Sequence, residues 1–151
     1  MKRLAGPLLL AVFLTACGVG TVNVPAPNPD PSAARLCNAL RARLPARLHG
    51  KGRRSTTPKS SFVTAWGSPA IALRCGVGRP AGLQATTEVT QISGISWFPQ
   101  PPDNPVTFTA VNLAAYVEVD IPAAYSPAGD VLTDLIPAIK ATIPLAPSGQ
   151  D

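Results

Sequence analysis

Hydrophobic and polar positions follow a helical period at the start of the folded part of this chain. Between Asp30 and Pro45, the apolar residues Ala33, Leu36, Cys37, Leu40 and Leu44 recur at helical spacing on one face. This spacing of three or four residues is typical of one face of an α-helix. Asp30 is suited to cap the helix and Pro31 to occupy its first turn, while Pro45 ends the pattern. We therefore expect a helix to open the domain.

Farther along, apolar residues alternate with polar or small ones, as they do in half-buried strands. The alternation is clearest from Ile71 to Val77, after a segment from Phe62 to Trp66 and a turn at Gly67-Ser68-Pro69. Further strands are predicted from Thr86 to Ser96 with a bulge or tight bend at Ser93-Gly94, and as a hairpin from Val106 to Val111 and Ala115 to Ile121.

A second helical pattern follows from Asp130 to Thr142, where Pro137 either kinks the helix or ends its first half. The apolar residues Val131, Leu135, Ile136 and Ile139 lie at helical spacing within it. Together the patterns predict an α+β fold with an N-terminal helix, a small antiparallel β-sheet, a C-terminal helix and one disulfide. Residues 31–151 have the size of a single domain and contain no internal repeat.

The N-terminus has the outline of an export signal. Lys2 and Arg3 precede an uncharged run from Leu4 to Ala16, which is short of the ~20 residues needed to span a bilayer. The sequence Leu14-Thr15-Ala16-Cys17-Gly18 resembles a bacterial lipobox, so we expect residues 1–16 to be a lipoprotein signal peptide and Cys17 to carry lipid. The alternatives are an uncleaved anchor and a freely secreted protein. The favoured interpretation places the protein on the outer face of the cytoplasmic membrane.

Residues 17–30 are predicted to be the lipidated cysteine and a stalk. Proline occupies every second position from Pro25 to Pro31, which favours extended polyproline II geometry at ~3.1 Å per residue. At that rise, residues 18–30 would span about 40 Å between the lipid and the domain.

Two cysteines remain after Cys17, namely Cys37 and Cys75. Each lies on the predicted apolar face of its element, and exported chains commonly form disulfides. A bridge would close a loop of about 38 residues, and two buried free thiols are the alternative. The two cysteines and the single His49 lack the spacing of a metal site, and no cofactor is expected.

Charge is distributed unevenly along the chain. Residues 31–87 contain ten basic residues and no acid, whereas residues 88–151 contain seven acids and one base, Lys140. The densest basic run supplies a candidate surface of Arg41, Arg43, Arg47, Lys51, Arg53 and Arg54. It could bind anionic lipid or another envelope phosphate, or it could be an ordinary solvated face. Export and the absence of interleaved aromatic residues argue against nucleic acid.

Motifs of catalysis are sparse. No GxSxG, HExxH, SxxK or phosphate-binding glycine loop occurs. Glu118 and Asp120 would share one face of a strand and are weak candidates for an acid–base pair, with a solvated strand face as the alternative. Trp66 and Trp97 suit the core or its rim better than a sugar-binding platform.

Four segments carry a family resemblance. They are Cys37-Asn38-Ala39-Leu40, Ala65 to Val77 (AWGSPAIALRCGV) with Arg79-Pro80, Ser93-Gly94-Ile95-Ser96-Trp97, and Val131-Leu132. Together they resemble the actinobacterial envelope family of domain of unknown function 3515, over nearly all of residues 31–151. The resemblance implies a membrane-associated or lipoprotein location and no assigned activity. Relatives often carry a further cysteine where this chain has Glu88-Val89-Thr90, which leaves the Cys37–Cys75 pairing open.

Two functions are consistent with these observations. The first is a membrane-anchored, non-catalytic module that binds an envelope protein, a wall polymer or anionic lipid. The second is a hydrolase-like enzyme that acts on an envelope substrate through Glu118 and Asp120. The absence of catalytic motifs favours the first, although it leaves enzymatic activity open.

Overall fold

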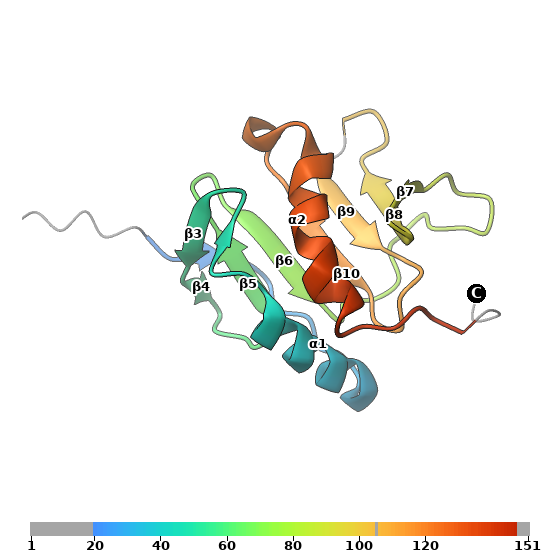
Figure 1. Cartoon of the computed structure of the whole chain (residues 1–151), viewed down its shortest axis with the longest axis horizontal. Coiled ribbons are helices and arrows are strands. Elements are labelled where there is room, and N and C mark those ends of the chain that lie inside the picture. The colour runs from blue at the N-terminus through green and yellow to red at the C-terminus, as the bar shows by residue number, and fades with distance from the viewer. Residues whose placement is uncertain (1–19, 105, 148–151) are drawn as a thin grey trace, which may run out of the picture.

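A computed structural model describes residues 20–104 and 106–147. It contains an eight-stranded antiparallel sheet with two α-helices, and a separate two-stranded pairing near the N-terminus (Figure 1). The helices are α1 (Pro31–Arg43) and α2 (Ala128–Lys140), with a short 3₁₀ helix η1 (Ala123–Tyr125) before α2. The strands are β1 (Val22–Asn23), β2 (Arg47–Leu48), β3 (Lys51–Arg54), β4 (Thr56–Thr57), β5 (Val63–Trp66), β6 (Ile71–Cys75), β7 (Thr90–Ile92), β8 (Ile95–Gln100), β9 (Thr107–Ala110) and β10 (Val117–Asp120).

The sheet has the order β2-β3-β5-β6-β10-β9-β8-β7, and β6 and β10 lie at its centre. In their register Val117 pairs with Cys75 and Val119 with Leu73. Side chains on a strand alternate between its two faces, so these residues share the face that packs against the helices. The intervening residues, including Arg74 and Glu118, lie on the opposite face. The predicted hairpin β9–β10 is present, and β5 and β6 pair across the predicted turn at Gly67-Ser68-Pro69.

Helix α1 begins where the sequence predicted. The carboxylate of Asp30 accepts hydrogen bonds from the amides of Ser32 (2.8 Å) and Ala33 (3.0 Å), and Pro31 is the first helical residue. In α2, Pro137 lies inside the helix, which continues to Lys140. The ring therefore neither ends the helix nor divides it into separate elements.

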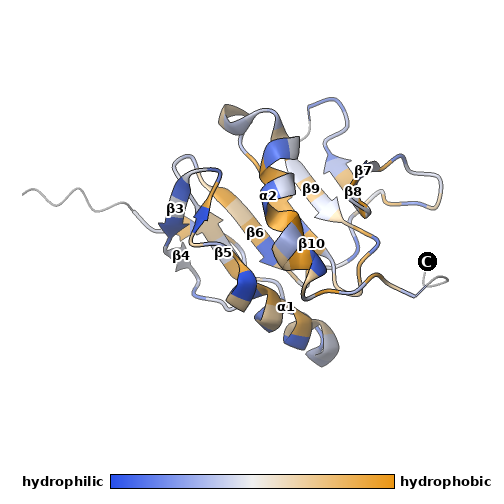
Figure 2. Ribbon diagram, viewed as in Figure 1, coloured by the Kyte–Doolittle hydropathy of each residue, from blue (hydrophilic) through white to orange (hydrophobic). Residues whose placement is uncertain are grey.

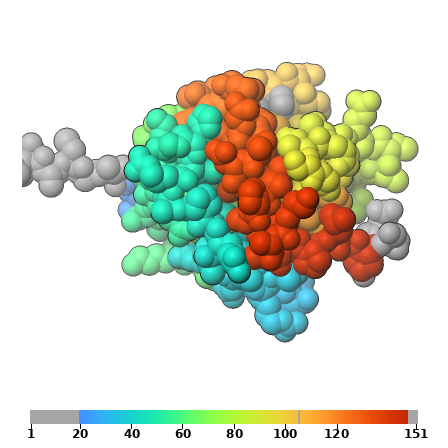
Figure 3. Space-filling model, viewed as in Figure 1, coloured from blue at the N-terminus to red at the C-terminus, as the bar shows by residue number. Residues whose placement is uncertain are grey.

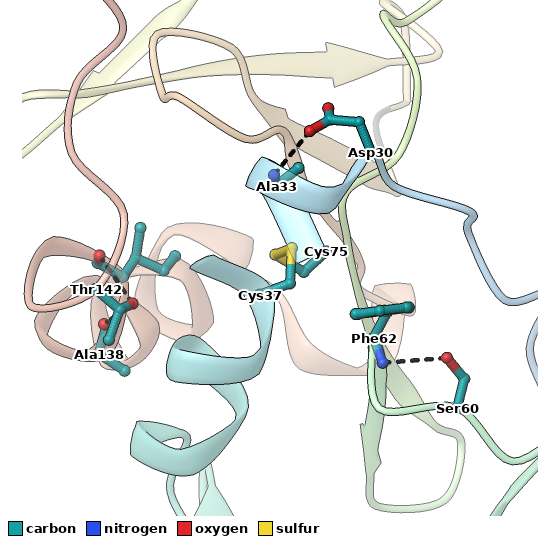
Figure 4. Close-up of a disulfide and its surroundings, with 9 residues drawn as sticks. Asp30, Ala33, Cys37, Ser60, Phe62, Cys75, Ala138 and Thr142 are labelled. Carbon is teal, nitrogen blue, oxygen red and sulfur yellow. Dashed lines mark hydrogen bonds between the residues drawn. A yellow bond between two sulfur atoms is a disulfide. The ribbon is translucent and has the colours of Figure 1, made fainter. Parts of the chain in front are cut away.

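The main core lies between the helices and the sheet. Helix α2 carries both apolar and polar residues (Figure 2), and its buried residues include Val131, Leu135 and Ile139. Trp66 and Trp97 are fully buried, which agrees with their predicted core role. The sulfurs of Cys37 on α1 and Cys75 on β6 lie 2.08 Å apart, a distance that supports the predicted disulfide (Figure 4). This pair links the first helix to a central strand.

Residues 20–24, which we name the strap, lie on the domain. The amide of Val22 donates to the carbonyl of Ser55 (2.9 Å), and that of Val24 donates to Thr57 (3.0 Å). Strand β1 thereby pairs in parallel with β4, and Val24 is buried against Val63 and Ala72. This region was expected to be a projecting stalk. The described part from Gly20 onward instead contributes apolar and hydrogen-bonding contacts to the fold.

Two parts of the predicted fold need correction. The sheet has eight strands and is not small, because the charged segment Lys51–Arg54 pairs with β5 and extends it. The helices are also not both terminal elements. Strand β1 precedes α1, and after α2 the chain forms an isolated bridge between Leu145 and Leu113. Within residues 20–104 and 106–147, no helix is long and apolar enough to cross a membrane.

Candidate anion-binding site

An open hollow of about 650 Å³ lies beside the strap, at the β3 side of the domain. Figure 3 shows the turquoise chain around β3 as an exposed flank next to α2. We call this feature the basic hollow. It is lined by Arg41, Arg53, Arg54, Ser55, Thr56, Lys59, Ser60, Ser61, Val63 and Thr64. Four of these residues carry positive charge, five carry a hydroxyl group, and none is acidic.

Three separate segments bring the cations together. Arg41 comes from the last turn of α1, Arg53 and Arg54 from β3, and Lys59 from the connection between β4 and β5. The reversal of the chain after α1 and the antiparallel pairing of β3 with β5 place these segments side by side. The basic hollow is therefore a product of tertiary structure.

The arginines are held by neutral backbone carbonyls. Arg41 Nη1 donates to Ser60 O (2.7 Å), and Arg53 Nη2 donates to Leu44 O (2.7 Å). Arg54 donates from Nη1 to Gly67 O (2.7 Å) and from Nη2 to Gly20 O in the strap. Carbonyl dipoles orient a guanidinium group without cancelling its net charge.

No carboxylate neutralises the basic hollow within the described ranges. Among the described residues, Arg74 pairs with Glu118, and His49 lies 4.0 Å from Asp134. Neither contact involves a residue of the basic hollow. Because like charges at close range raise the local potential, the site would attract an anion. Its combination of guanidinium, ammonium and hydroxyl donors suits an oxyanion such as phosphate.

Three of the six predicted basic residues line the basic hollow. Arg41, Arg53 and Arg54 line the basic hollow, whereas Arg43, Arg47 and Lys51 do not. Arg47 Nη2 donates to Gly50 O (2.9 Å), and Lys51 Nζ lies 6.0 Å from the ring centroid of Tyr125. The helix and strand periods direct neighbouring side chains to different places.

Lys59 was missed because it follows the basic run and has no basic neighbour in sequence. The serine- and threonine-rich segment from Ser55 to Ser61 was the available clue, since it supplies hydroxyl groups between two cationic segments.

The carboxylate candidates lie on the sheet face opposite the helices. Arg74 donates to Glu118 Oε1 through Nε (2.9 Å) and through Nη2, and the Glu118 side chain is 14% exposed. Asp120 Oδ1 accepts a hydrogen bond from the Thr107 hydroxyl (2.7 Å). Glu118 is therefore engaged in a cross-strand ion pair. Cys17, the predicted lipidation site, lies outside the described residues.

In the part of the chain that the structure describes, no three His, Cys, Asp or Glu side chains lie close enough together to hold a metal ion. His49 is exposed; its Nδ1 lies 4.0 Å from a carboxylate oxygen of Asp134, and its ring is edge-on to that of Tyr125.

Comparison with known proteins identifies the family of this chain. No curated protein and no solved structure matches this chain. A model of the family described as protein of unknown function (DUF3515) matches residues 8–148, nearly the whole sequence. The family resemblance carried by the segments around Cys37, Cys75 and Trp97 is thus confirmed. The chain belongs to the DUF3515 family of proteins of unknown function.

Proposed function

We propose that this protein is a membrane-anchored envelope lipoprotein and a non-catalytic binding module whose basic hollow takes an anionic partner. Cys17 would carry the lipid at the outer face of the cytoplasmic membrane. The observation that carries the binding role is the convergence of Arg41, Arg53, Arg54 and Lys59 around one hollow without a carboxylate. The lipobox-like sequence before Gly18 supports the anchor.

The contacts of the carboxylate candidates favour binding over hydrolysis. A general acid or base must exchange protons with a substrate, but Glu118 is paired with Arg74 and Asp120 accepts a hydrogen bond from Thr107. Both residues project from central strand β10 on the face away from the helices, and neither lines the basic hollow.

The anchor is tested by the intact mass of protein extracted from membranes, beside a Cys17→Ala variant. We expect a chain that begins at residue 17 and carries a lipid increment, which the variant lacks. A signal-cleaved chain without lipid, released into the medium, would refute the anchor.

The binding role is tested with isolated envelopes and an unlipidated mature chain, residues 17–151 with Cys17→Ser. We expect Lys59→Glu to reduce retention, because it places a carboxylate in the basic hollow. Arg43→Glu is the matched control, since it makes the same charge change on α1 outside the basic hollow. Equal retention of wild type and Lys59→Glu at low salt would count against the site.

A further inference from the structure

The strap connects the basic hollow to the predicted anchor through a short path. Arg54, which lines the basic hollow, donates to the carbonyl of Gly20, and Ser55 accepts from the amide of Val22. Strand β1 then pairs with Thr56 and Thr57, of which Thr56 is also a lining residue. One wall of the basic hollow is therefore hydrogen-bonded to the first described residues of the chain.

Covalent geometry limits how far this wall can lie from the lipid. Gly20 is three residues after Cys17, and an extended chain advances at most ~3.6 Å per residue. The carbonyl that Arg54 holds is thus within about 11 Å of the anchored residue. The headgroup layer on each side of a bilayer is roughly 5–8 Å thick. A lipid on Cys17 would hold this wall of the basic hollow within the headgroup layer or just above it.

The chemistry of the basic hollow matches a phosphate group in that layer. Arg41 and Lys59 contribute charge at its rim, and each is exposed. Arg53 and Arg54 are fixed by main-chain carbonyls, so little side-chain freedom is lost when an anion binds. Hydroxyl groups from Ser55, Ser60 and Thr64 supply further donors.

From this position and chemistry we infer that the basic hollow binds the phosphate headgroup of an anionic phospholipid in the membrane that holds the anchor. The inference rests on the proposed lipid anchor at Cys17. The bound headgroup and the acyl chains would form two attachments to the same membrane. These attachments would orient the domain with the β3 side toward the bilayer.

The test uses the mature chain, residues 17–151 with Cys17→Ser, so that no acyl chain contributes to binding. Binding to vesicles of phosphatidylglycerol and phosphatidylcholine is measured by co-sedimentation, with pure phosphatidylcholine as the neutral reference. Each basic residue near an anionic surface contributes roughly a fivefold gain in binding. Arg41→Gln with Lys59→Gln should therefore weaken vesicle binding by about 30-fold.

The matched control is Arg35→Gln with Arg43→Gln. It removes the same charge from exposed positions on α1 that do not line the basic hollow. Arg43 is about 200° around the helix from Arg41, at 100° per residue. The control should lose much less binding than the test variant. Equal losses would show a diffuse charge effect and overturn the site.

Two further outcomes separate the sources of phosphate. Titration with inorganic pyrophosphate, followed by the amide NMR signals of Ser55 and Thr56, tests a soluble ligand. Tight pyrophosphate binding without vesicle binding would overturn the headgroup assignment. Retention by isolated cell wall but not by vesicles would overturn it in favour of a wall polymer. Vesicle binding by a protein whose native form carries no lipid would refute the proposed anchor and leave the headgroup site standing.

Discussion

Removal of the Cys37–Cys75 link should destabilise the domain strongly. The two residues are 38 positions apart. In the chain-entropy model, closing a loop of that length restricts the unfolded chain by about 4 kcal/mol at 25 °C. Native domains are stable by about 5–15 kcal/mol, so the link would supply a large share of the total. We therefore expect Cys37→Ala with Cys75→Ala to approach the limit of stability at 37 °C.

The measurement is urea unfolding of the mature chain with Cys17→Ser, followed by the fluorescence of Trp66 and Trp97. Both indoles are fully buried and should report global unfolding. With an m-value of about 1.5–2 kcal/mol per molar urea, a 4 kcal/mol loss lowers the midpoint by about 2–3 M. Intact mass should rise by about 2 Da when the oxidised chain is reduced under denaturing conditions.

Reduced wild-type protein is the control, because it loses the crosslink but keeps both sulfur atoms. Cys37 and Cys75 are 1% and 2% exposed, so part of the loss in the double variant comes from the deleted side chains. The reduced protein separates the two effects. A midpoint shift below about 0.5 M on reduction, at unchanged m-value, would refute the loop-entropy reasoning.

Three other perturbations test local features. Asp30→Ala should lower the stability of the domain at pH 7, because hydrogen bonds from the amides of Ala33 and Ser32 hold the pKa of Asp30 below its ordinary value of 3.8. The difference in stability from wild type should be complete above pH 3.8 and should shrink as the carboxylate protonates in more acid solution. Thermal unfolding at pH 7 and pH 2.5 measures this, and an equal difference at both would contradict it. Glu118→Gln should cost about 2 kcal/mol in urea unfolding because Arg74 keeps a half-buried charge without its partner, and an unchanged midpoint would show that the pair is dispensable. Gly76→Ala should lower the free energy of unfolding by about 2 kcal/mol or more, since φ at this residue is +81° and the new Cβ would lie 2.5 Å from Pro29 Cβ. Gly78→Ala is the control: no heavy atom lies within 4 Å of its Cβ, so the free energy of unfolding should change by less than about 0.5 kcal/mol.

Much of the fold was predictable because its signals are local. Asp30 and Pro31 identified the start of α1, and the alternation from Ile71 to Cys75 identified the central strand β6. Ser93-Gly94 was expected to be a bulge or tight bend, and it forms the turn of the β7–β8 hairpin, where both residues have positive φ. In each case the residues that carry the pattern are also the residues that contact one another.

The strands at the β3 side could not be predicted in the same way. Lys51-Gly52-Arg53-Arg54 has no apolar alternation and is a strand because Arg53 and Arg54 pair with Trp66 and Ala65. Strand β1 precedes a proline-rich segment and depends on backbone groups of residues 55–57. Pairing between distant segments overrides weak local preference in both places.

The candidate site was only half predictable for a related reason. The basic run from Arg41 to Arg54 showed where cations gather, but it did not show which side chains share a surface. Arg41 and Arg43 project to different sides of α1, and Lys59 joins the basic hollow through the loop between β4 and β5. Sequence proximity is therefore a poor guide to proximity around this site.

The strap also changes how the domain would explore its surroundings. A free tether of about 40 Å would let the domain search a volume that grows with the cube of its reach. A reach of about 11 Å confines the domain to roughly one fiftieth of that volume. The effective concentration of any ligand on the membrane surface would rise by a similar factor. The few contacts that Val22 and Val24 make with the domain would thus shorten the reach of a chain anchored at Cys17. Such a chain would meet partners in the plane of the membrane more often than partners deeper in the wall.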